Sequence, residues 1–393
     1  MPPTSPSAAT RDTPRSSAFA AWEREPVSLA EFRSWNCEST RLLSRAQAHH
    51  LFEYSLLAPS THNSVPQVYH FDLEAQRLEL WLRRELVLPA SDPDGREAII
   101  SLGCAVENLS TAAAQYGIAC RWQRASDLAW SEVCHRADTS PVRVGWLELA
   151  LGELPHDEAR QRATLSNLLA RRTSRAEFDG AERLPEGLRA QLERACTDSA
   201  VQLDVFESTR DKFAWGKLDE AATKHKLEEH AFRRELADWL LPNEDQSSVR
   251  GMRGVEFGLD DRVTRELSAQ LHGDTPMPVD RLAFLARGGR QGLCSAAAVC
   301  ALSTPNDTPD TALRIGRAFQ RCALLAYAGG LGCAVHTALC QVSHLRAMSQ
   351  ATLMRGDAPP ALVFRLGKPR HVADGHRPHA SRPQLEELLL KQR

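Results

Sequence analysis

The segment Ala58–Pro66 carries five consecutive polar side chains between two prolines: Ser60, Thr61, His62, Asn63 and Ser64. Proline fixes the torsion φ, and hydroxyl and amide side chains readily hydrogen-bond the backbone or a ligand. Such a loop can present several hydrogen-bonding groups to a flat polar ligand. An ordinary helix-to-strand turn has the same composition, so the segment alone leaves both interpretations open.

A second polar segment could bind phosphate. It consists of Arg171, Arg172, Thr173, Ser174 and Arg175 after an apolar helical run. Guanidinium groups bind phosphate through two parallel hydrogen bonds, and hydroxyl groups add donors. A solvated basic turn is the alternative. The later segment 365–370, which contains Arg365 and Lys368, adds positive charge after the last predicted strand.

Glycine spacing indicates an internal repeat. Gly103 and Gly117 are 14 positions apart, and so are Gly316 and Gly330. The two pairs are offset by 213 positions, and each second glycine follows a small-residue helical stretch. A glycine there suits the left-handed position just after a helix. The repeat predicts two similar domains in one chain, as in a fused symmetric dimer, although two alanine-rich helices can also be similar by chance.

Composition excludes several function classes. The net charge of -2 gives no strong field for nucleic acid, and no apolar run is long enough to cross a membrane. None of the ten cysteines forms a C-x-x-C pair, which favours a reduced, cytoplasmic protein without a metal site. The Ser-, Pro- and Ala-rich residues 1–30 are predicted to be a disordered leader.

Helical and strand patterns alternate along both halves and predict an α+β fold. We expect a first half over residues 31–157 and a second half over 158–393. The second half carries a stretch of about 208–292 that has no counterpart in the first. A stretch this long is typical of a lid or an interface. Its aromatic residues either line a substrate cavity or pack a small core of their own: Trp215, Phe232, Trp239 and Phe257.

These segments resemble motifs of the nitroreductase superfamily, and most closely those of its tandem, single-chain Acg-type branch. Ala58–Pro66 is similar to the family's A-P-S-x-x-N loop, and Arg171–Arg175 to its R-R-T-N-R run. Leu88–Glu97 is similar to the L-P-x-x-D-P-x-x-R-E run of that branch, and Ile99–Ala105 to its I-S-x-G-A-A helix start. The resemblance spans residues 46–380.

The resemblance implies two tandem nitroreductase-like domains that form an intramolecular pseudo-dimer, with a lid-like insertion in the second half. It also implies an FMN-dependent oxidoreductase that transfers electrons from NAD(P)H to a small organic acceptor in a ping-pong cycle. The loop and the Arg171–Arg175 run each occur in one half, which predicts one FMN per chain. The chain would be a monomeric pseudo-dimer or a homodimer. The FMN-binding residues implied are Ser60, Thr61, His62, Asn63, Ser64, Gln67, Arg171, Arg172, Thr173, Ser174, Arg175, Gly330, Leu331, Gly332, Arg365 and Lys368.

Asn63, with Ser60 or His62, is expected at the pyrimidine edge of the ring, and no catalytic side chain is assigned. The chain departs from the family at Val65-Pro66-Gln67, where relatives have Gln-Pro-Trp. This departure, with the long insertion, leaves three alternatives open. One is a protein that sequesters FMN with little turnover, and another is a flavin-dependent dehydrogenase of a specialised biosynthetic pathway. The third is an interaction protein without a ligand.

Overall fold

The computed structural model describes residues 25–36, 42–126, 128–134, 138–154, 157–197, 200–245, 248–371 and 379–390. Most of the predicted leader and Cys37 lie outside the described residues. Helix α1 begins at Leu29, so the prediction of a leader through residue 30 extends too far. Within the described ranges, no helix is both long enough and apolar enough to span a membrane.

The first half is an antiparallel four-stranded sheet, in the order β1-β2-β4-β3, covered by helices on one face. Every second side chain of a strand points to the same face of the sheet, and Leu78, Leu80 and Leu82 of β2 are accordingly all fully buried. The elements are α1 (Leu29–Ser34), α2 (Arg45–Leu56), η2 (Thr61–Asn63), β1 (Gln67–Asp72), β2 (Arg77–Leu82), η3 (Arg84–Leu86), α3 (Arg96–Gln115), β3 (Ile118–Arg124), α4 (Trp130–Val133) and β4 (Val142–Leu151).

The second half contains a second antiparallel four-stranded sheet, in the order β5-β8-β10-β9. Counted within each half, this is the same strand order as in the first sheet. The elements outside the insertion are α5 (Glu158–Ala170), α6 (Leu188–Thr197), β5 (Gln202–Phe206), β8 (Ala298–Ser303), α11 (Pro309–Ala328), β9 (Gly332–His336), α12 (Ala338–Gln341), α13 (Ser343–Thr352), β10 (Leu362–Gly367) and η6 (Leu385–Leu388).

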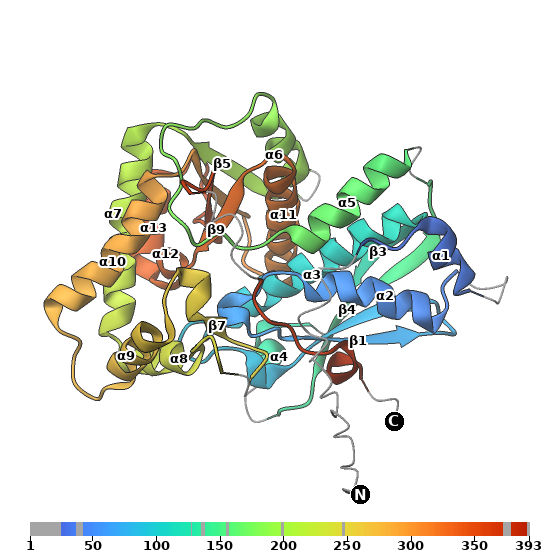
Figure 1. The fold of residues 1–393 in the computed structure, drawn as a ribbon, viewed down its shortest axis with the longest axis horizontal. Helices are drawn as coiled ribbons and strands as arrows, with labels where there is room; N and C mark the ends of the chain where they lie inside the picture. The colour runs from blue at the N-terminus through green and yellow to red at the C-terminus, as the bar shows by residue number, and fades with distance from the viewer. Residues whose placement is uncertain are drawn as a thin grey trace, which may run out of the picture.

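Helices α3 and α11 cross between the two sheets (Figure 1). Each has 20 residues, and their first residues, Arg96 and Pro309, are offset by the same 213 positions as the glycine repeat. Both helices lead into a glycine in the left-handed region, with φ of 76° at Gly117 and 77° at Gly330. The prediction of left-handed glycines after these helices is therefore confirmed.

The crossing is close because glycine faces glycine. A Cβ atom on Gly103 would lie 2.1 Å from the carbonyl oxygen of Leu313, and one on Gly316 would lie 1.9 Å from that of Ile100. Farther along the crossing, Gln320 Nε2 donates to Asn108 Oδ1 over 2.6 Å. The polar pairing and the backbone contact together fix how the two halves dock.

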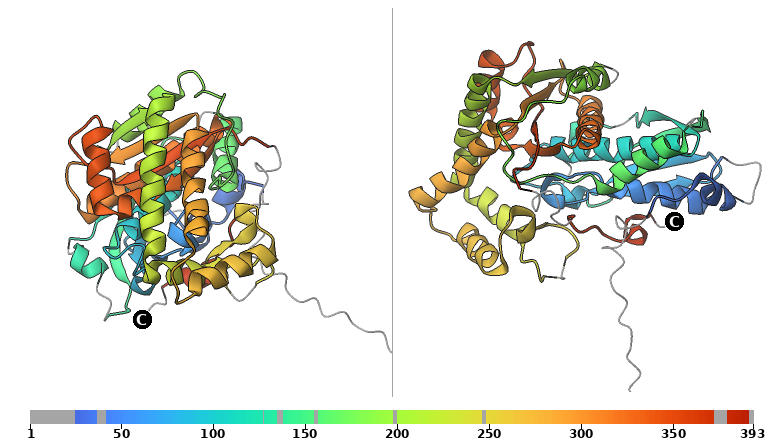
Figure 2. Two further views of the ribbon diagram at one scale, coloured as in Figure 1. Left: turned by 90° about the vertical axis from the view of Figure 1, so that its left-hand side faces the viewer. Right: turned by 45° about the horizontal axis from the view of Figure 1, so that its top comes forward.

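The insertion replaces a tight turn. Residues 73–76 join β1 to β2, whereas residues 207–297 join the corresponding strands β5 and β8. Helices α7 and α10 pack side by side and cover the second sheet (Figure 2). The sequence predicted loops up to residue 280 and missed α10. The insertion's elements are α7 (Thr209–Glu228), α8 (His230–Asp238), β6 (Leu240–Leu241), β7 (Met252–Arg253), η4 (Gly254–Phe257), α9 (Asp261–His272) and α10 (Val279–Cys294).

The insertion also contacts the first half. Glu235 of α8 accepts hydrogen bonds from the backbone N–H groups of Ala90 and Ser91, each over 2.8 Å. Of its aromatic residues, Trp215 packs in a core against the second sheet, and Phe232 packs in a small core of the insertion itself. The insertion is thus fastened to both halves of the chain.

The glycine crossing can be tested by adding one methyl group. Gly316→Ala forces the two backbones apart, and we expect it to lower the free energy of unfolding by about 3 kcal/mol or more. Gly288→Ala in α10 is the control, because no described heavy atom lies within 4 Å of the added carbon. That substitution should stabilise the helix by about 0.5–1 kcal/mol. Urea unfolding measures both, and equal effects would contradict a close crossing.

Candidate functional site

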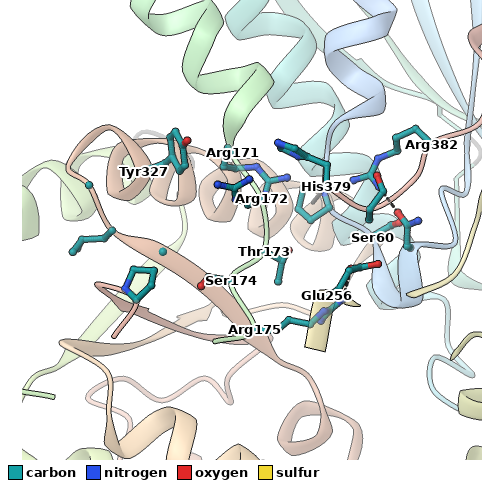
Figure 3. A pocket seen from close by; sticks show the side chains of 17 residues that line it. Ser60, Arg171, Arg172, Thr173, Ser174, Arg175, Glu256, Tyr327, His379 and Arg382 are labelled. Carbon is teal, nitrogen blue, oxygen red and sulfur yellow. Dashed lines mark hydrogen bonds and ion pairs between the residues drawn. The ribbon is translucent and has the colours of Figure 1, made fainter. Parts of the chain in front are cut away.

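A cavity of about 330 Å³ lies where the polar loop of the first half meets the second half (Figure 3). Its volume falls in the range of small-molecule sites. Six separate segments of the chain contribute to its wall. The lining residues are Pro59, Ser60, Asn63, Arg171, Arg172, Thr173, Ser174, Arg175, Glu256, Tyr327, Gly330, Leu331, Gly332, Pro369, His379, Ala380 and Arg382.

The loop before β1 is held in an uncommon backbone conformation. His62, Asn63 and Val65 have φ of 51°, 56° and 48°. A positive φ is unfavourable for most side chains and a marked outlier for β-branched Val65, so the surrounding structure must impose it. Residues in such conformations gather at functional sites.

Asn63 supplies much of this constraint. Its Nδ2 group donates to the carbonyl oxygens of Gly251 and Ser381, each over 3.0 Å, and its Oδ1 atom accepts from Arg382. The amide is therefore fully used inside the protein. This corrects the expectation that Asn63 points its amide at a ligand, because here it ties the loop to the insertion and to the C-terminal segment.

The basic segment follows α5 directly. Arg171 is buried and donates to the carbonyl oxygen of Leu57 over 2.9 Å, which joins it to the end of α2. The backbone N–H of Ser174 donates to the carbonyl oxygen of Cys333 over 2.8 Å, so the segment lies along β9. Arg175 packs over the Phe257 ring at 4.4 Å and lies 3.6 Å from Glu256.

Several buried donors in this wall have no acceptor. Arg171 Nε, Arg175 Nε and Ser174 Oγ make no hydrogen bond within the part of the chain that the structure describes. An unmade hydrogen bond to a buried polar atom costs about 1–3 kcal/mol. These atoms are suited to a ligand that brings acceptor oxygens.

The C-terminal contribution differs from the predicted one. Lys368 lies outside the cavity and pairs with Glu182 at 3.3 Å on the surface. The buried Arg365 guanidinium packs over the Phe178 ring at 4.2 Å and donates to the carbonyl oxygen of Ala176 over 2.8 Å. Both predicted placements in this cavity are wrong, because these cations are held by other parts of the protein.

Two residues that sequence reasoning missed take their place. His379 and Arg382 reach the cavity from the segment after residue 378, and Arg382 donates to the carbonyl oxygen of Leu56 over 2.8 Å. Their segment carries no helical or strand periodicity. Only their basic character, a few residues beyond the last strand, could have drawn attention to them.

The cavity is strongly electropositive. Among its described lining residues there are four arginines and one carboxylate, that of Glu256. Burial lowers the pKa of Arg171 and of Arg175, and it lowers the pKa of Arg382 to about 10. Burial, and next the Arg172 charge, lower the pKa of His379 to about 3. Burial is the main cause of each shift, and neighbouring arginine charges add to it only at Arg382 and His379. An anionic ligand would stabilise this poorly solvated positive charge.

A second, smaller cavity of about 140 Å³ adjoins the first. The two share Pro59, Ser60, Thr173 and Arg175 in their walls. The second cavity reaches between α3 and α11. Its other lining residues are Thr61, His62, Glu97, Ile100, Ser101, Cys104, Met252, Phe319, Val335, Thr337 and Leu362.

Two ionisable groups in the second cavity are strongly shifted. Burial, and next the Arg175 charge, lower the pKa of His62 to about 4, so this ring is neutral at pH 7. Burial, and next the charge of Asp92, raise the pKa of Glu97 to about 7. Shifts of this size gather at functional sites.

The remaining predicted residues divide as follows. Gly330, Leu331 and Gly332 line the first cavity, whereas Ser64 and Gln67 are buried outside both cavities. No described atom lies within 4 Å of the position of a Cβ on Gly330. The positive φ, rather than a crowded contact, therefore requires glycine there.

Metal ligands do not gather in the described residues. No group of three or more His, Cys, Asp and Glu side chains there could hold a metal ion. The described cysteines form no disulfide bond, and Cys196 Sγ and Cys322 Sγ lie 3.6 Å apart in the core.

The sequence is similar to three proteins of Mycobacterium tuberculosis. One, named "Uncharacterized protein Rv3127", is 28% identical over 85% of this chain and 90% of its own length. A second, named "Putative NAD(P)H nitroreductase Rv3131", is 26% identical over 86% of this chain and 90% of its own. The third, named "Putative NAD(P)H nitroreductase acg", is 25% identical over 78% and 84%. No protein-family model matches the sequence.

Two solved structures are also similar in part. The FMN-dependent nitroreductase NfnB of Mycobacterium smegmatis, in complex with NADPH, matches at 16% identity and a TM-score of 0.41 over 60% of this chain and 100% of its own. A protein from Anabaena variabilis, named "putative nitroreductase", matches at 12% identity and a TM-score of 0.39 over 82% of this chain and 74% of its own.

Asn63 offers a test of how the loop is fastened. Asn63→Ala removes hydrogen bonds to Gly251, Ser381 and Arg382, and we expect a loss of about 3 kcal/mol in the free energy of unfolding. Asn306→Ala is the control, because this exposed residue accepts bonds from Thr304 and Thr311 through its backbone carbonyl. The control should change stability by less than about 0.5 kcal/mol. Urea unfolding compares the two, and equal effects would argue against a fastening role.

Glu97 predicts a pH dependence of stability. Its folded pKa of about 7 exceeds the usual 4.5, so the native state holds the proton more tightly than the unfolded chain. The contribution of protonated Glu97 to the free energy of unfolding is fully present below pH 4.5 and is lost as pH rises through about 7. Glu97→Gln, which cannot ionise, should therefore gain on the order of 2 kcal/mol relative to wild type between pH 4.5 and pH 8. Chemical unfolding at several pH values tests this, and a difference that stays constant with pH would contradict it.

Proposed function

We propose that this chain, a homologue of the mycobacterial Acg-type nitroreductases, is an FMN-dependent oxidoreductase. It would take electrons from NAD(P)H and pass them to a small organic acceptor in a ping-pong cycle. One observation carries the proposal: arginines and unpartnered buried donors of the second half meet the polar loop of the first half around one cavity, which adjoins a second. The cofactor would supply the hydride chemistry, and the protein its placement and electrostatics.

The residues present fit FMN in charge and in donor pattern. Arg171, Arg172 and Arg382 would hold the phosphate, whose negative charge offsets their crowded positive charge. Ser174 Oγ and Thr173 would face the ribityl hydroxyls. The ring system would extend toward the second cavity, where Thr61 and Glu97 offer polar contacts and Ile100, Phe319 and Val335 offer apolar ones.

The insertion would exclude water from this site. Gly251 bonds to Asn63 in both directions, through its carbonyl oxygen to the Asn63 side chain over 3.0 Å and through its N–H to the Asn63 backbone oxygen over 3.3 Å. Glu256 lies against Arg175, and Met252 lines the second cavity. We therefore propose that residues 208–292 act as a lid, since removal of water strengthens electrostatic interactions inside a site.

We further propose that residues 31–157 and 158–393 are nitroreductase-like halves of a pseudo-dimer with one FMN per chain. The equal strand order, the 213-residue offset and the crossing at Gly103 and Gly316 support a duplication. A difference between two related glycines supports a single site. Gly330 faces an open cavity, whereas a Cβ on its counterpart Gly117 would lie 2.8 Å from Leu154. The segment that connects the two halves, which contains Leu154, therefore fills the space where an opposite site would lie.

The tight fastening of the insertion favours one second candidate, a protein that sequesters FMN with little turnover. The bonds of Glu235 to Ala90 and Ser91, added to those of Asn63, would slow the entry of an acceptor. Anaerobic mixing of the FMN-loaded protein with NADPH separates the two functions. Rapid bleaching of the flavin absorption supports an enzyme, and an unchanged spectrum supports sequestration.

The binding site can be tested with two basic residues that differ in position. Arg382→Gln removes a cavity cation, and we expect the Kd for FMN to rise by about 10- to 100-fold, since a charge-assisted hydrogen bond is worth about 1.5–3 kcal/mol. Lys368→Gln, which alters a surface pair outside the cavity, should leave the Kd unchanged. Titration of the apoprotein by flavin fluorescence measures both. A wild-type protein that binds no FMN would overturn the proposed function.

A further inference from the structure

Glu97 lies at the wall of the second cavity in the first turn of α3, and its side chain is buried. Its two carboxyl oxygens have different partners. Thr61 Oγ1 donates to Oε2 over 2.8 Å, and Gln341 Nε2 donates to Oε1 over 2.8 Å. Thr61 also lines the cavity, so its hydroxyl contacts the carboxyl group beside the space that a ligand would fill.

Burial, and next a neighbouring carboxylate, favour the protonated form of Glu97. Asp92 accepts hydrogen bonds from the backbone N–H groups of Glu97 and Ala98, over 3.0 and 2.8 Å, and such bonds favour its charged form. Burial raises the pKa of both carboxyl groups. The negative charge of Asp92 then opposes ionisation of Glu97.

Other charged or ionisable groups surround this pair on several elements. Arg96 on α3 favours the ionised form of Glu97, and burial raises the pKa of the Cys340 thiol on α12 to about 11. The neutral His62 ring and the Arg175 guanidinium share the cavity wall. A carboxyl group whose proton is held near neutral pH is suited to general acid chemistry.

The hydrogen-bond partners suit both protonation states of Glu97. A threonine hydroxyl can donate to a carboxylate, or accept from a carboxylic acid and pass on its own proton. Gln341 Oε1 is buried and has no partner within the described structure, so rotation of this amide would offer an acceptor to protonated Glu97. The network therefore need not break when the proton moves.

We propose that Glu97 is the proton donor for reduction in this site and that Thr61 relays its proton into the cavity. This inference rests on the proposed oxidoreductase function. An organic acceptor such as a quinone gains two electrons and one proton as a hydride, supplied ultimately by NAD(P)H, and it needs a second proton to become the neutral hydroquinone. Glu97 gives up that proton through Thr61, and solvent water then reprotonates the carboxylate.

The second half provides a matched control. Asp310 occupies the position of α11 that corresponds to Glu97 by the 213-residue offset, and it pairs with Arg314 at 2.9 Å away from both cavities. Asp310→Asn removes an acidic group from the same helical turn without touching the proposed relay. Thr61→Val removes the relay hydroxyl and keeps the side-chain volume.

The test combines a binding and a kinetic measurement on the full chain. Titration calorimetry of apoprotein with FMN, in two buffers of different ionisation enthalpy, counts the protons exchanged on binding. Wild type and Asp310→Asn should exchange a fraction of a proton near pH 7, and Glu97→Gln should lose this component.

In stopped flow, oxidation of the reduced protein by 1,4-benzoquinone should slow about tenfold per pH unit above pH 7 in wild type. It should be at least tenfold slower at pH 6, and independent of pH, in Glu97→Gln and Thr61→Val.

The outcomes separate the two hypotheses. If the wild-type protein binds no FMN, the proposed function fails and the proton inference fails with it. If FMN binds and both Glu97→Gln and Thr61→Val keep the wild-type pH profile, only the proton inference is overturned. Circular dichroism verifies folding, and Thr61→Val still tests the relay if Glu97→Gln does not fold.

Discussion

The close contact between Gly103 and Gly316 is the constraint on which the rest of the structure depends. Because neither residue has a side chain, α3 and α11 approach until backbone meets backbone, and the two sheets are held at a fixed spacing. That spacing decides how far the loop after α2 lies from the segment after α5. Both segments line the first cavity, so its dimensions depend on a contact between two glycines on neighbouring helices.

A concentration of buried positive charge is the second consequence of this docking. Arg171 bonds to the carbonyl oxygen of Leu57 and Arg382 to that of Leu56, so both arginines satisfy the exposed end of α2. Cations are favourable at the C-terminal end of a helix dipole. Part of the positive charge thus stabilises the fold without a ligand, and the remaining unpartnered donors are suited to an anion.

The sequence predicted the parts of the site that local pattern controls. Helix α3, the strands around it and the left-handed glycines follow from periodicity and glycine spacing. The resemblance to nitroreductase motifs implied that Ser60, Arg171 and Gly330 share one site, and all three line the first cavity. Arg382 was missed because its place depends on where an irregular C-terminal segment turns, which no local period encodes. Arg365 was misplaced because its side chain lies on a strand with two possible faces, and the packing of Phe178 selects the other one.

Duplication explains why one chain can carry a complete site beside an incomplete one. In a symmetric dimer, every substitution appears twice, so a residue that fills one pocket fills the other. In a fused chain the two positions vary independently. Leu154 can occupy the space beside Gly117 while the space beside Gly330 stays open, and Asp310 can pair at the surface while its counterpart Glu97 is buried beside a cavity. The sheets and the crossing helices keep the symmetry because their packing requires it. The polar residues around the two related positions do not keep it, because no such packing constrains them.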